Sequence, residues 1–426
     1  MPLNVLVNGA GICGPAVALF LLHSDPSHNI TVVERSPGLR TAGQQIDIRA
    51  QGIPIMKKLG LLEKVKQRTV AESGVAVVDA QGTIKALFEV NNSGKGQQAL
   101  TSEYEIMRGD LVDVLYQESL EVGRRVERDG KGPGVKYEFG KYATQLSQDD
   151  SGVDVIFSDG SRGRYDLAVG CDGQGSRTRR MVWGEEQGNN VFKSLGGLVA
   201  FFSIPREQEE DIGKLFNLPE YRVVFTRTGN RPVTQVVLGV LDKVEDLTDY
   251  PSKSVEEQKA AWRKLYADCK WQRERLLNGL DTTEDFYMTE LGQVKMDSWA
   301  EGRVVLVGDA GYAPSGVTGQ GTTASLVGAY ILAGELARHG DDVAAALRSY
   351  DKVLRPYVNE MQKLAPGTPN LLYPKTEWGI WALQTALGVV TKLQIYKVLN
   401  MILPDTKGGL GLPEYPDLNL PGDIVL

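Results

Sequence analysis

The chain has little of what metal and disulfide sites need. Among its 426 residues are only three cysteines and three histidines, and no two cysteines form a Cys-x-x-Cys pair. This composition excludes the usual ligand patterns of zinc and iron–sulfur sites. The cysteines, Cys13, Cys171 and Cys269, are far apart and odd in number, which favours a reducing, cytoplasmic setting.

Long apolar runs and a surplus of basic residues are also missing. No stretch of about 18 apolar residues occurs, so the sequence predicts no membrane-spanning segment. The amino terminus, MPLNVLVNGAG, has no basic segment before its apolar run and is not typical of a signal peptide. Acidic residues outnumber basic ones by 54 to 47, giving a net charge of −7, so no nucleic-acid partner is expected.

The remaining composition is that of a globular protein with many tight turns. Hydrophobic residues make up 42% and charged residues 24%, and the length suits two domains. The 48 glycines exceed the usual share of about 7%. We therefore expect several turns at which the backbone approaches a ligand closely.

A dinucleotide-binding turn lies at the amino terminus. Gly9, Gly11 and Gly14 form a GxGxxG pattern between a short apolar run and a helical pattern. Such glycines allow the tight turn, the approach of a pyrophosphate, and close packing of helix on strand. Glu34, about 20 residues on, is placed to bind a ribose 2′-hydroxyl and to repel a 2′-phosphate, so the turn suits FAD or NAD rather than NADP. The unit expected is a strand at 3–7, a helix at 15–23 and a strand at 30–34.

Two later motifs favour a flavin. One is YDLAVGCDGQGSRTR at 165–179, in which an apolar strand ends in Asp172 before a helix start. The other is GRVVLVGDA at 302–310, followed by GQGTT at 319–323. Asp309 at a strand end can accept hydrogen bonds from a ribityl chain. The Gly-rich turn at a helix N-terminus can hold the electron-rich edge of an isoalloxazine ring.

In this order and spacing, the three motifs resemble the single-component (class A) FAD-dependent monooxygenases, a family that includes aromatic hydroxylases. The likeness covers residues 3 to about 340. A narrower similarity, to flavin monooxygenases that inactivate tetracyclines, rests on Glu34-Arg35 with Arg40, on GQQIDIR at 43–49, and on RGDL at 108–111.

The fold class predicted is α/β: a Rossmann-like FAD-binding domain with an inserted, sheet-built substrate domain and a C-terminal helical segment. Strand patterns separated by turns at 191–241 predict the inserted sheet, and a long polar helix is expected at 254–278. The ranges expected are 1–70, 100–180 and 285–345 for the FAD-binding domain, 71–99 and 181–284 for the substrate domain, and 346–426 for the C-terminal helical region.

The turn motifs and the resemblance together assign the candidate site residues. By position, the resemblance implies that Asp47 and Arg108 contact FAD, and that Arg40 lies near the incoming nicotinamide cofactor. Arg231 is expected on the substrate side, with Tyr221 as a weaker candidate. The cofactor-binding set is Gly9, Gly11, Gly14, Glu34, Arg35, Arg40, Asp47, Arg108, Asp172, Asp309, Gly319, Gly321 and Thr322; the catalytic set is Arg231 and Tyr221.

Structural roles stay open for several of these residues. Asp47 and Arg49 on one strand face could form only a structural pair. Arg231 could be an exposed hairpin residue, and an aromatic such as Tyr221 on a sheet is often part of a core. An apolar helix around Trp378 to Trp381 could cover the site, pack as an ordinary helix, or lie on a membrane surface.

The sequence departs from the family pattern around the flavin ring. The usual His after Gly-Asp-Ala-Ala is replaced by Gly311-Tyr312, and the usual Pro pair by Pro314-Ser315-Gly316. Thr323 stands where an Asn is usual, and Gly328-Ala329 replaces the helical Asp-Ala. These changes leave the oxygenation outcome open rather than FAD binding.

The resemblance implies an enzyme that uses NADPH or NADH and O₂ to hydroxylate an aromatic or polycyclic, polyketide-like molecule of secondary metabolism through a flavin C4a-hydroperoxide. No second GxGxxG occurs, so the nicotinamide cofactor is expected to bind only transiently. The alternatives are Baeyer–Villiger insertion or epoxidation on the same fold, an NAD(P)H-independent flavin oxidase or dehydrogenase, and a non-catalytic nucleotide-binding protein. The expected assembly is a monomer or homodimer.

Overall fold

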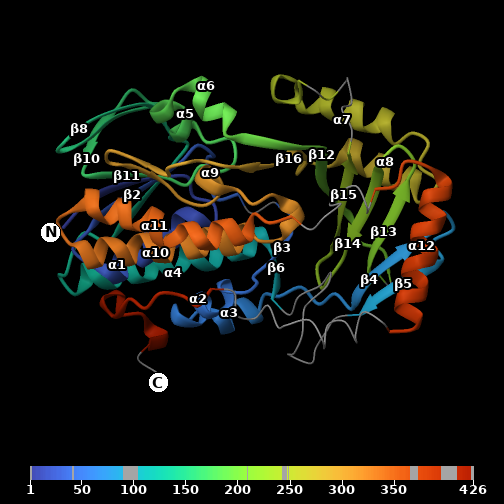
Figure 1. Ribbon diagram of the computed structural model, residues 1–426, viewed down its shortest axis with the longest axis horizontal. Coiled ribbons are helices and arrows are strands. Elements are labelled where there is room, and N and C mark those ends of the chain that lie inside the picture. Colours follow the sequence, from blue (N-terminus) through green and yellow to red (C-terminus); the bar gives the residue numbers. More distant parts are fainter. Residues whose placement is uncertain are drawn as a thin grey trace.

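In the computed structural model, the protein has two halves, each built around its own sheet (Figure 1). The residues described are 2–40, 43–89, 104–208, 210–241, 247, 249–364, 373–394 and 410–423.

The first half is built on a six-stranded sheet. In spatial order its strands are β17 (Ala300–Glu301), β18 (Val304–Leu306), β11 (Leu167–Gly170), β1 (Asn4–Asn8), β2 (Asn29–Glu34) and β7 (Val135–Phe139). All neighbours pair in parallel except β17 with β18. The central strands are short, buried apolar runs, as a parallel strand covered on both faces should be.

Helices cover one face of this sheet, and a small antiparallel sheet covers the other. The helices are α1 (Cys13–Ser24), α4 (Arg108–Arg128) and α10 (Gly321–His339), with α11 (Val343–Met361) packed on α10. The small sheet consists of β8 (Ala143–Asp149), β9 (Gly152–Phe157) and β10 (Arg162–Tyr165), and α5 (Arg177–Trp183) and α6 (Glu185–Asn190) follow β11. Because α1 is enclosed by the sheet, α4 and α10, it is apolar on nearly all sides.

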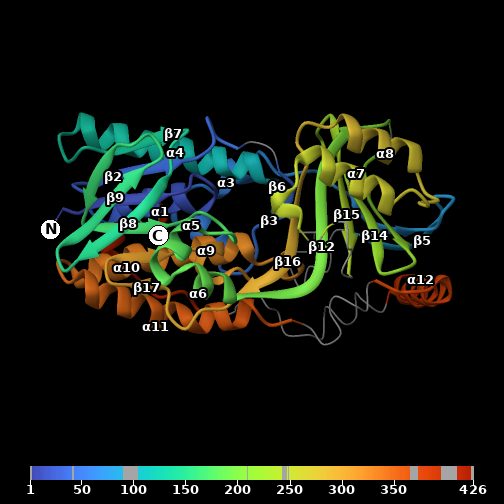
Figure 2. The ribbon, with the colours of Figure 1, turned by 90° about the horizontal axis from the view of Figure 1, so that it is seen from above.

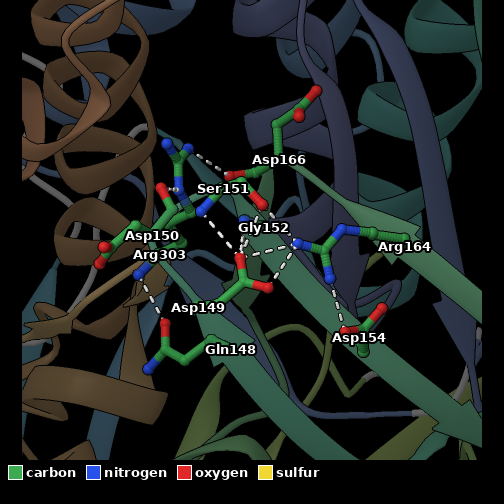
Figure 3. A network of polar contacts seen from close by, with 9 residues as sticks. All are labelled: Gln148, Asp149, Asp150, Ser151, Gly152, Asp154, Arg164, Asp166 and Arg303. Carbon is green, nitrogen blue, oxygen red and sulfur yellow. Dashed lines mark hydrogen bonds and ion pairs between the residues drawn. The ribbon is translucent and has the colours of Figure 1, made fainter.

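Figure 3 shows a polar network at the tip of the hairpin formed by β8 and β9. Arg164 donates from Nη2 to Asp149 Oδ1 at 2.7 Å and from Nη1 to Asp154 Oδ2 at 2.5 Å. Arg303, just before β18, donates from Nε to the Asp150 carbonyl at 2.8 Å. The network is exposed and links the hairpin to the six-stranded sheet through Arg303, so its role is structural.

The second half is built on a seven-stranded sheet. Its order is β16 (Tyr287–Val294), β12 (Phe192–Pro205), β15 (Val233–Val240), β14 (Arg222–Arg227), β13 (Gly213–Leu218), β4 (Gly74–Val78) and β5 (Ile84–Glu89). The sequence analysis assigns 71–99 and 181–284 to this domain. Strand β16 also joins this sheet, although it lies in the range 285–345 assigned to the FAD-binding domain.

Helices α7 (Val255–Leu265) and α8 (Arg273–Thr282) cover one face of this sheet (Figure 2). Ser254 and Glu257 form a capping box at the start of α7. The prediction of one helix over 254–278 is wrong. Helix α7 ends at Leu265, and Gln272 takes a left-handed conformation with φ 46° before α8 begins.

A two-stranded sheet of β3 (Gln45–Asp47) and β6 (Glu105–Met107) lies between the two halves (Figure 1). Two short helices follow β3 in the sequence, α2 (Gly52–Lys58) and α3 (Leu62–Lys66), separated by a turn at Gly60 with φ 70°. The remaining short elements are α9 (Asp309–Tyr312) and the 3₁₀ turns Tyr250–Ser252, Gly316–Thr318, Pro416–Leu418 and Pro421–Asp423.

The C-terminal residues divide between the two halves. Helix α12 (Glu377–Lys392) packs against β5 and β13, on the face of the second sheet opposite α7 and α8 (Figure 2). Residues 410–423 return to the first half, where Tyr330 Oη donates to the Pro413 carbonyl. Trp378 and Trp381 on α12 are 74% and 61% exposed. None of the helices in the described ranges has the length and apolar character needed to span a bilayer.

Candidate cofactor and substrate site

Four loops that carry predicted site residues meet at the carboxyl edge of the six-stranded sheet. They follow β1, β2, β11 and β18 and carry Gly9, Glu34, Asp172 and Asp309. The loops are joined directly, since the Gly9 amide donates to the Val33 carbonyl at 2.8 Å. In parallel sheets this edge is where ligands bind, at the point where the strand order reverses. The cavity there is lined by Gly9, Gly11, Glu34, Arg35, Arg40, Arg108 and Asp172, among others.

The three glycines of the turn have different surroundings. A Cβ on Gly9 would lie 2.6 Å from the Cys171 carbonyl oxygen, and one on Gly14 only 1.9 Å from the Gly9 carbonyl oxygen. A Cβ on Gly11 would meet only Arg108 Nη2, at 3.4 Å. Gly9 and Gly14 are therefore required by packing, whereas Gly11 faces the cavity beside a guanidinium group. This is the arrangement that a pyrophosphate needs.

Glu34 and Asp172 already hold the backbone of the site. Glu34 accepts from the Ala10 and Ser36 amides, both at 2.9 Å, so it fixes the glycine turn and still lines the cavity. Asp172 accepts from the Thr178 amide at 2.9 Å and from Ser176 Oγ, and so orders the start of α5. The structure adds these backbone roles to the ligand roles expected from the sequence.

The Asp309 carboxylate lies at the start of α9, near the glycine turn that begins α10. Within the described residues it has no hydrogen bond through its side chain, and Oδ1 lies 3.8 Å from the position of a Cβ on Gly321. Loss of solvent raises the pKa of Asp309 to about 6, although the positive charge of Arg108 opposes the shift. A half-buried carboxylate without donors fits the hydroxyl groups of a ribityl chain, which would supply them.

The loop at 43–49 lies against the turn at 319–323. The Arg49 guanidinium is 3.8 Å from the position of a Cβ on Gly319, and Thr323 Oγ1 donates to the Arg49 carbonyl at 2.9 Å. Arg49 also donates from Nε to Asp47 Oδ2 at 2.8 Å, so the structural pair that the sequence left open does form. Thr322 is buried in the first turn of α10.

Side chains of the second sheet fix this loop, a feature that the sequence analysis missed. Gln235 on β15 accepts from the Gln45 amide at 2.7 Å and donates to the Gly43 carbonyl at 2.9 Å. Tyr287 on β16 donates to Gln44 Oε1. No local pattern could reveal these contacts, because about 190 to 240 residues separate the partners in the sequence.

An apolar patch occupies the face of the second sheet opposite α7 and α8, next to the 316–318 turn. Tyr221, one of the two predicted catalytic residues, belongs to it, and so does Val317 from the turn itself. Phe201, a member of the patch, stacks on Tyr287, with ring centroids 4.9 Å apart. The patch consists of Val199, Leu241 and Leu291, with Leu195, Phe201, Tyr221, Val237, Val317 and Tyr373 packed against them.

Arg231, the other predicted catalytic residue, has a different environment. Its guanidinium pairs with Asp110, in the first turn of α4, and its side chain is 39% exposed. It does not belong to the apolar patch. Arg222, next to Tyr221, points to the helix-covered face, where it pairs with Asp268 at 2.7 Å.

The geometry of these loops is that of one class of protein. A glycine turn and an acidic residue at the end of β2 line one cavity, as a dinucleotide site requires. The Asp309 carboxylate after β18 lies beside a second glycine turn, at the start of α10. This turn lies beside an apolar patch on a separate sheet. This is the construction of a flavoprotein that places its cofactor against a substrate domain.

The comparisons agree with this class. Residues 2–365 match the FAD binding domain family. The chain is 44% identical to a FAD-dependent monooxygenase, asL6, of Sarocladium schorii, across 98% of this chain and 99% of that protein. It is 34% identical to a flavin-dependent monooxygenase, eupH, of a Phoma species, across 97% of this chain and 98% of that one. The solved structure of the tetracycline destructase Tet(51) is similar with a TM-score of 0.75 and 29% identity, covering 97% of this chain and 100% of that one.

The chain therefore belongs to the FAD-dependent monooxygenases and is an enzyme with FAD as its cofactor. The family, the α/β fold class and the FAD cofactor expected from the sequence are confirmed. The roles of individual site residues and the domain boundaries stay predictions.

Proposed function

We propose that this monooxygenase uses NADPH or NADH and O₂ to hydroxylate an aromatic or polycyclic, polyketide-like molecule held between FAD and the apolar patch. The observation that carries the proposal is the position of Val317. It belongs to the patch and is two residues from Gly319 in the turn expected to hold the flavin ring. When bound and reduced, FAD supplies the activation of O₂. The protein supplies binding, orientation and exclusion of water.

The chemistry of the patch favours a flat, apolar substrate. Partly buried aliphatic and aromatic side chains lie at this patch, and aromatic rings pack well against such side chains. A similar solved protein is named a tetracycline destructase, and tetracycline is a polycyclic molecule. We propose Tyr221 as a substrate contact on the patch and Arg231 as a more peripheral group near the start of α4.

Location and assembly belong to the same proposal. The scarcity of cysteine and the absence of an apolar run of about 18 residues support a cytoplasmic enzyme. We propose a monomer or a homodimer, which light scattering of the purified holoenzyme would distinguish.

The test is anaerobic reduction of the holoenzyme. NADPH and NADH are each mixed with the enzyme, alone and with a panel of phenolic and polyketide compounds, and the flavin absorbance near its visible maximum is followed. We expect bleaching that a substrate accelerates at least tenfold, followed in air by a product heavier by one oxygen atom. Bleaching by a substrate without NAD(P)H would replace the proposal with an oxidase or dehydrogenase. Product regiochemistry would separate hydroxylation from Baeyer–Villiger insertion or epoxidation.

Filling the patch should weaken substrate binding without loss of cofactor. Val237→Trp places a large ring on the patch, where the Val237 side chain is only half-buried. We expect KM for the substrate to rise about tenfold or more, because the added volume occupies substrate space. Ile84→Trp serves as the control, since Ile84 is 48% exposed on β5 of the same sheet, outside the patch. Equal KM values for the two variants and wild type would remove the patch from the substrate site.

A further inference from the structure

Five charged side chains form a continuous cluster between the second sheet and the loop at 43–49. Arg227 on β14 donates from Nε to Glu72 at 3.1 Å and from Nη2 to Glu105 at 2.6 Å. On β3, the strand that pairs with β6, the Asp47 carboxylate accepts a hydrogen bond from Arg49 Nε. The side chains of Glu72 and Glu105 are 1% and 3% exposed, and Asp47 is 10% exposed. The three carboxylates are therefore largely closed to water, whereas the Arg49 side chain is 24% exposed.

Two carboxylates meet in the middle of this cluster. Asp47 and Glu105 stand directly opposite each other in the antiparallel pair of β3 and β6, so their side chains lie on the same face. Asp47 Oδ1 and Glu105 Oε1 are both buried, and neither has a hydrogen-bond partner within the residues described. Two like charges on directly opposite residues, each with an unused oxygen, repel unless a proton lies between them.

The charge balance of the cluster leads to the same conclusion. Three carboxylates and two guanidinium groups leave one negative charge in excess, which burial disfavours. The charged groups placed against Glu105 are Arg227 of β14, Glu72 before β4 and Asp47 of β3. Burial, with Asp47 and Glu72, raises the pKa of Glu105 to about 7, although Arg227 opposes the shift. One proton on Glu105 makes the cluster neutral.

We propose that Glu105 is a positioning residue for FAD: in its neutral form it donates to Asp47 and keeps the Asp47–Arg49 pair seated against the turn at 319–321. Arg49 is the link, because it touches both Asp47 and the region of Gly319. When Glu105 is ionised, repulsion across β3 and β6 loosens Arg49 and the turn that is expected to hold the flavin ring. The inference rests on the proposed placement of that ring, and it adds a residue outside the cofactor-binding set.

The experiment titrates the apoprotein with FAD, using quenching of flavin fluorescence at pH 6.5, 7.5 and 8.5. For wild type we expect the dissociation constant to rise about tenfold or more between pH 6.5 and 8.5, since binding is coupled to one proton. Glu105→Gln, which stays neutral and keeps a donor, should bind FAD with little change over this range. A flat wild-type profile, or a Gln variant that follows the wild-type slope, would overturn the inference.

Melting of the apoproteins provides a measurement without FAD. Because the pKa of Glu105 is raised in the folded state, its contribution to stability is present at low pH and is lost as the pH rises through about 7. The melting temperature of Glu105→Gln relative to wild type should therefore increase from pH 6 to pH 8.5. A plain ion pair between Glu105 and Arg227 predicts a less stable variant at every pH, and this result would contradict the inference.

The design separates this inference from the proposed function. FAD titration needs neither NAD(P)H nor substrate, so a flat pH profile with tight FAD binding rejects only the role of Glu105. If Glu105→Gln does not fold, the wild-type profile still decides. The control is Glu138→Gln on β7, which removes a carboxylate paired with Lys141 on the protein surface and should leave the profile unchanged.

Discussion

Replacing Asp309 with Ala should abolish most FAD binding and, at the same time, stabilise the apoprotein at neutral pH. The Asp309 carboxylate, which follows β18, has no hydrogen-bond donor among the described residues. The positive charge of Arg108 acts to lower its pKa. In the apoprotein the carboxylate is a half-buried charge without a donor. In the holoenzyme, donors from the ribityl chain would satisfy it. Hydrogen bonds to charged groups contribute about 1.5–3 kcal/mol each, so the FAD dissociation constant should rise about 100-fold when two are lost.

The stability effect has a defined pH dependence. The pKa of Asp309 is raised from 3.8 to about 6 in the folded protein, so its contribution is present below pH 4 and lost as the pH rises through 6. The ionised carboxylate then costs up to about 3 kcal/mol, which the variant avoids. Asp309→Ala should melt above wild-type apoprotein at pH 8, and the gain should vanish near pH 4.

The measurement combines thermal melting of apoprotein at both pH values with FAD titration at pH 8. Asp297→Asn is a matched control, because Asp297 is an exposed acid in the loop after β16 and should change neither quantity. A yellow, stoichiometrically loaded Asp309→Ala protein would contradict the ribityl contact. A variant that melts lower at pH 8 would show that the carboxylate stabilises the apoprotein.

Short-range signals were sufficient for the amino-terminal strand–helix–strand unit of the six-stranded sheet. The strand, glycine turn, helix and second strand at the amino terminus are each specified within a few residues, and the structure forms them at nearly the predicted bounds. The prediction of one helix over 254–278 was wrong, and the reason is also local. The polar composition of this segment gave no sign of the left-handed residue Gln272, which starts a separate helix.

The candidate site was less accessible to sequence analysis, because its parts are joined by distant contacts. Asp47 and Arg108 stand in recognisable motifs, but Gln235 and Arg227 lie in ordinary strand sequence. Their importance comes from what they touch across the domain boundary. For Arg231 the resemblance implied the substrate side, which stays a prediction, and the structure adds its ion pair with Asp110, which no local pattern indicated.

The glycine turn allows the packing and ligand roles of glycine to be separated by two single substitutions. Gly14→Ala should destabilise the apoprotein by about 3 kcal/mol or more, because its Cβ would lie 1.9 Å from the Gly9 carbonyl oxygen and the backbone must shift. Gly11→Ala should change apoprotein stability by less than about 0.5 kcal/mol. Its Cβ meets only the flexible end of Arg108, at 3.4 Å.

FAD affinity should not follow stability in this pair. The methyl group of Gly11→Ala projects into the cavity where the pyrophosphate is expected, so the dissociation constant should rise about 100-fold in a protein that melts like wild type. Apoprotein melting and FAD titration of the two variants, side by side, make the test. Wild-type affinity in Gly11→Ala would remove Gly11 from the cofactor contacts. A loss of stability equal to that of Gly14→Ala would make Gly11 a packing residue. Low affinity with an intact fold would place the pyrophosphate at this turn, beside Arg108.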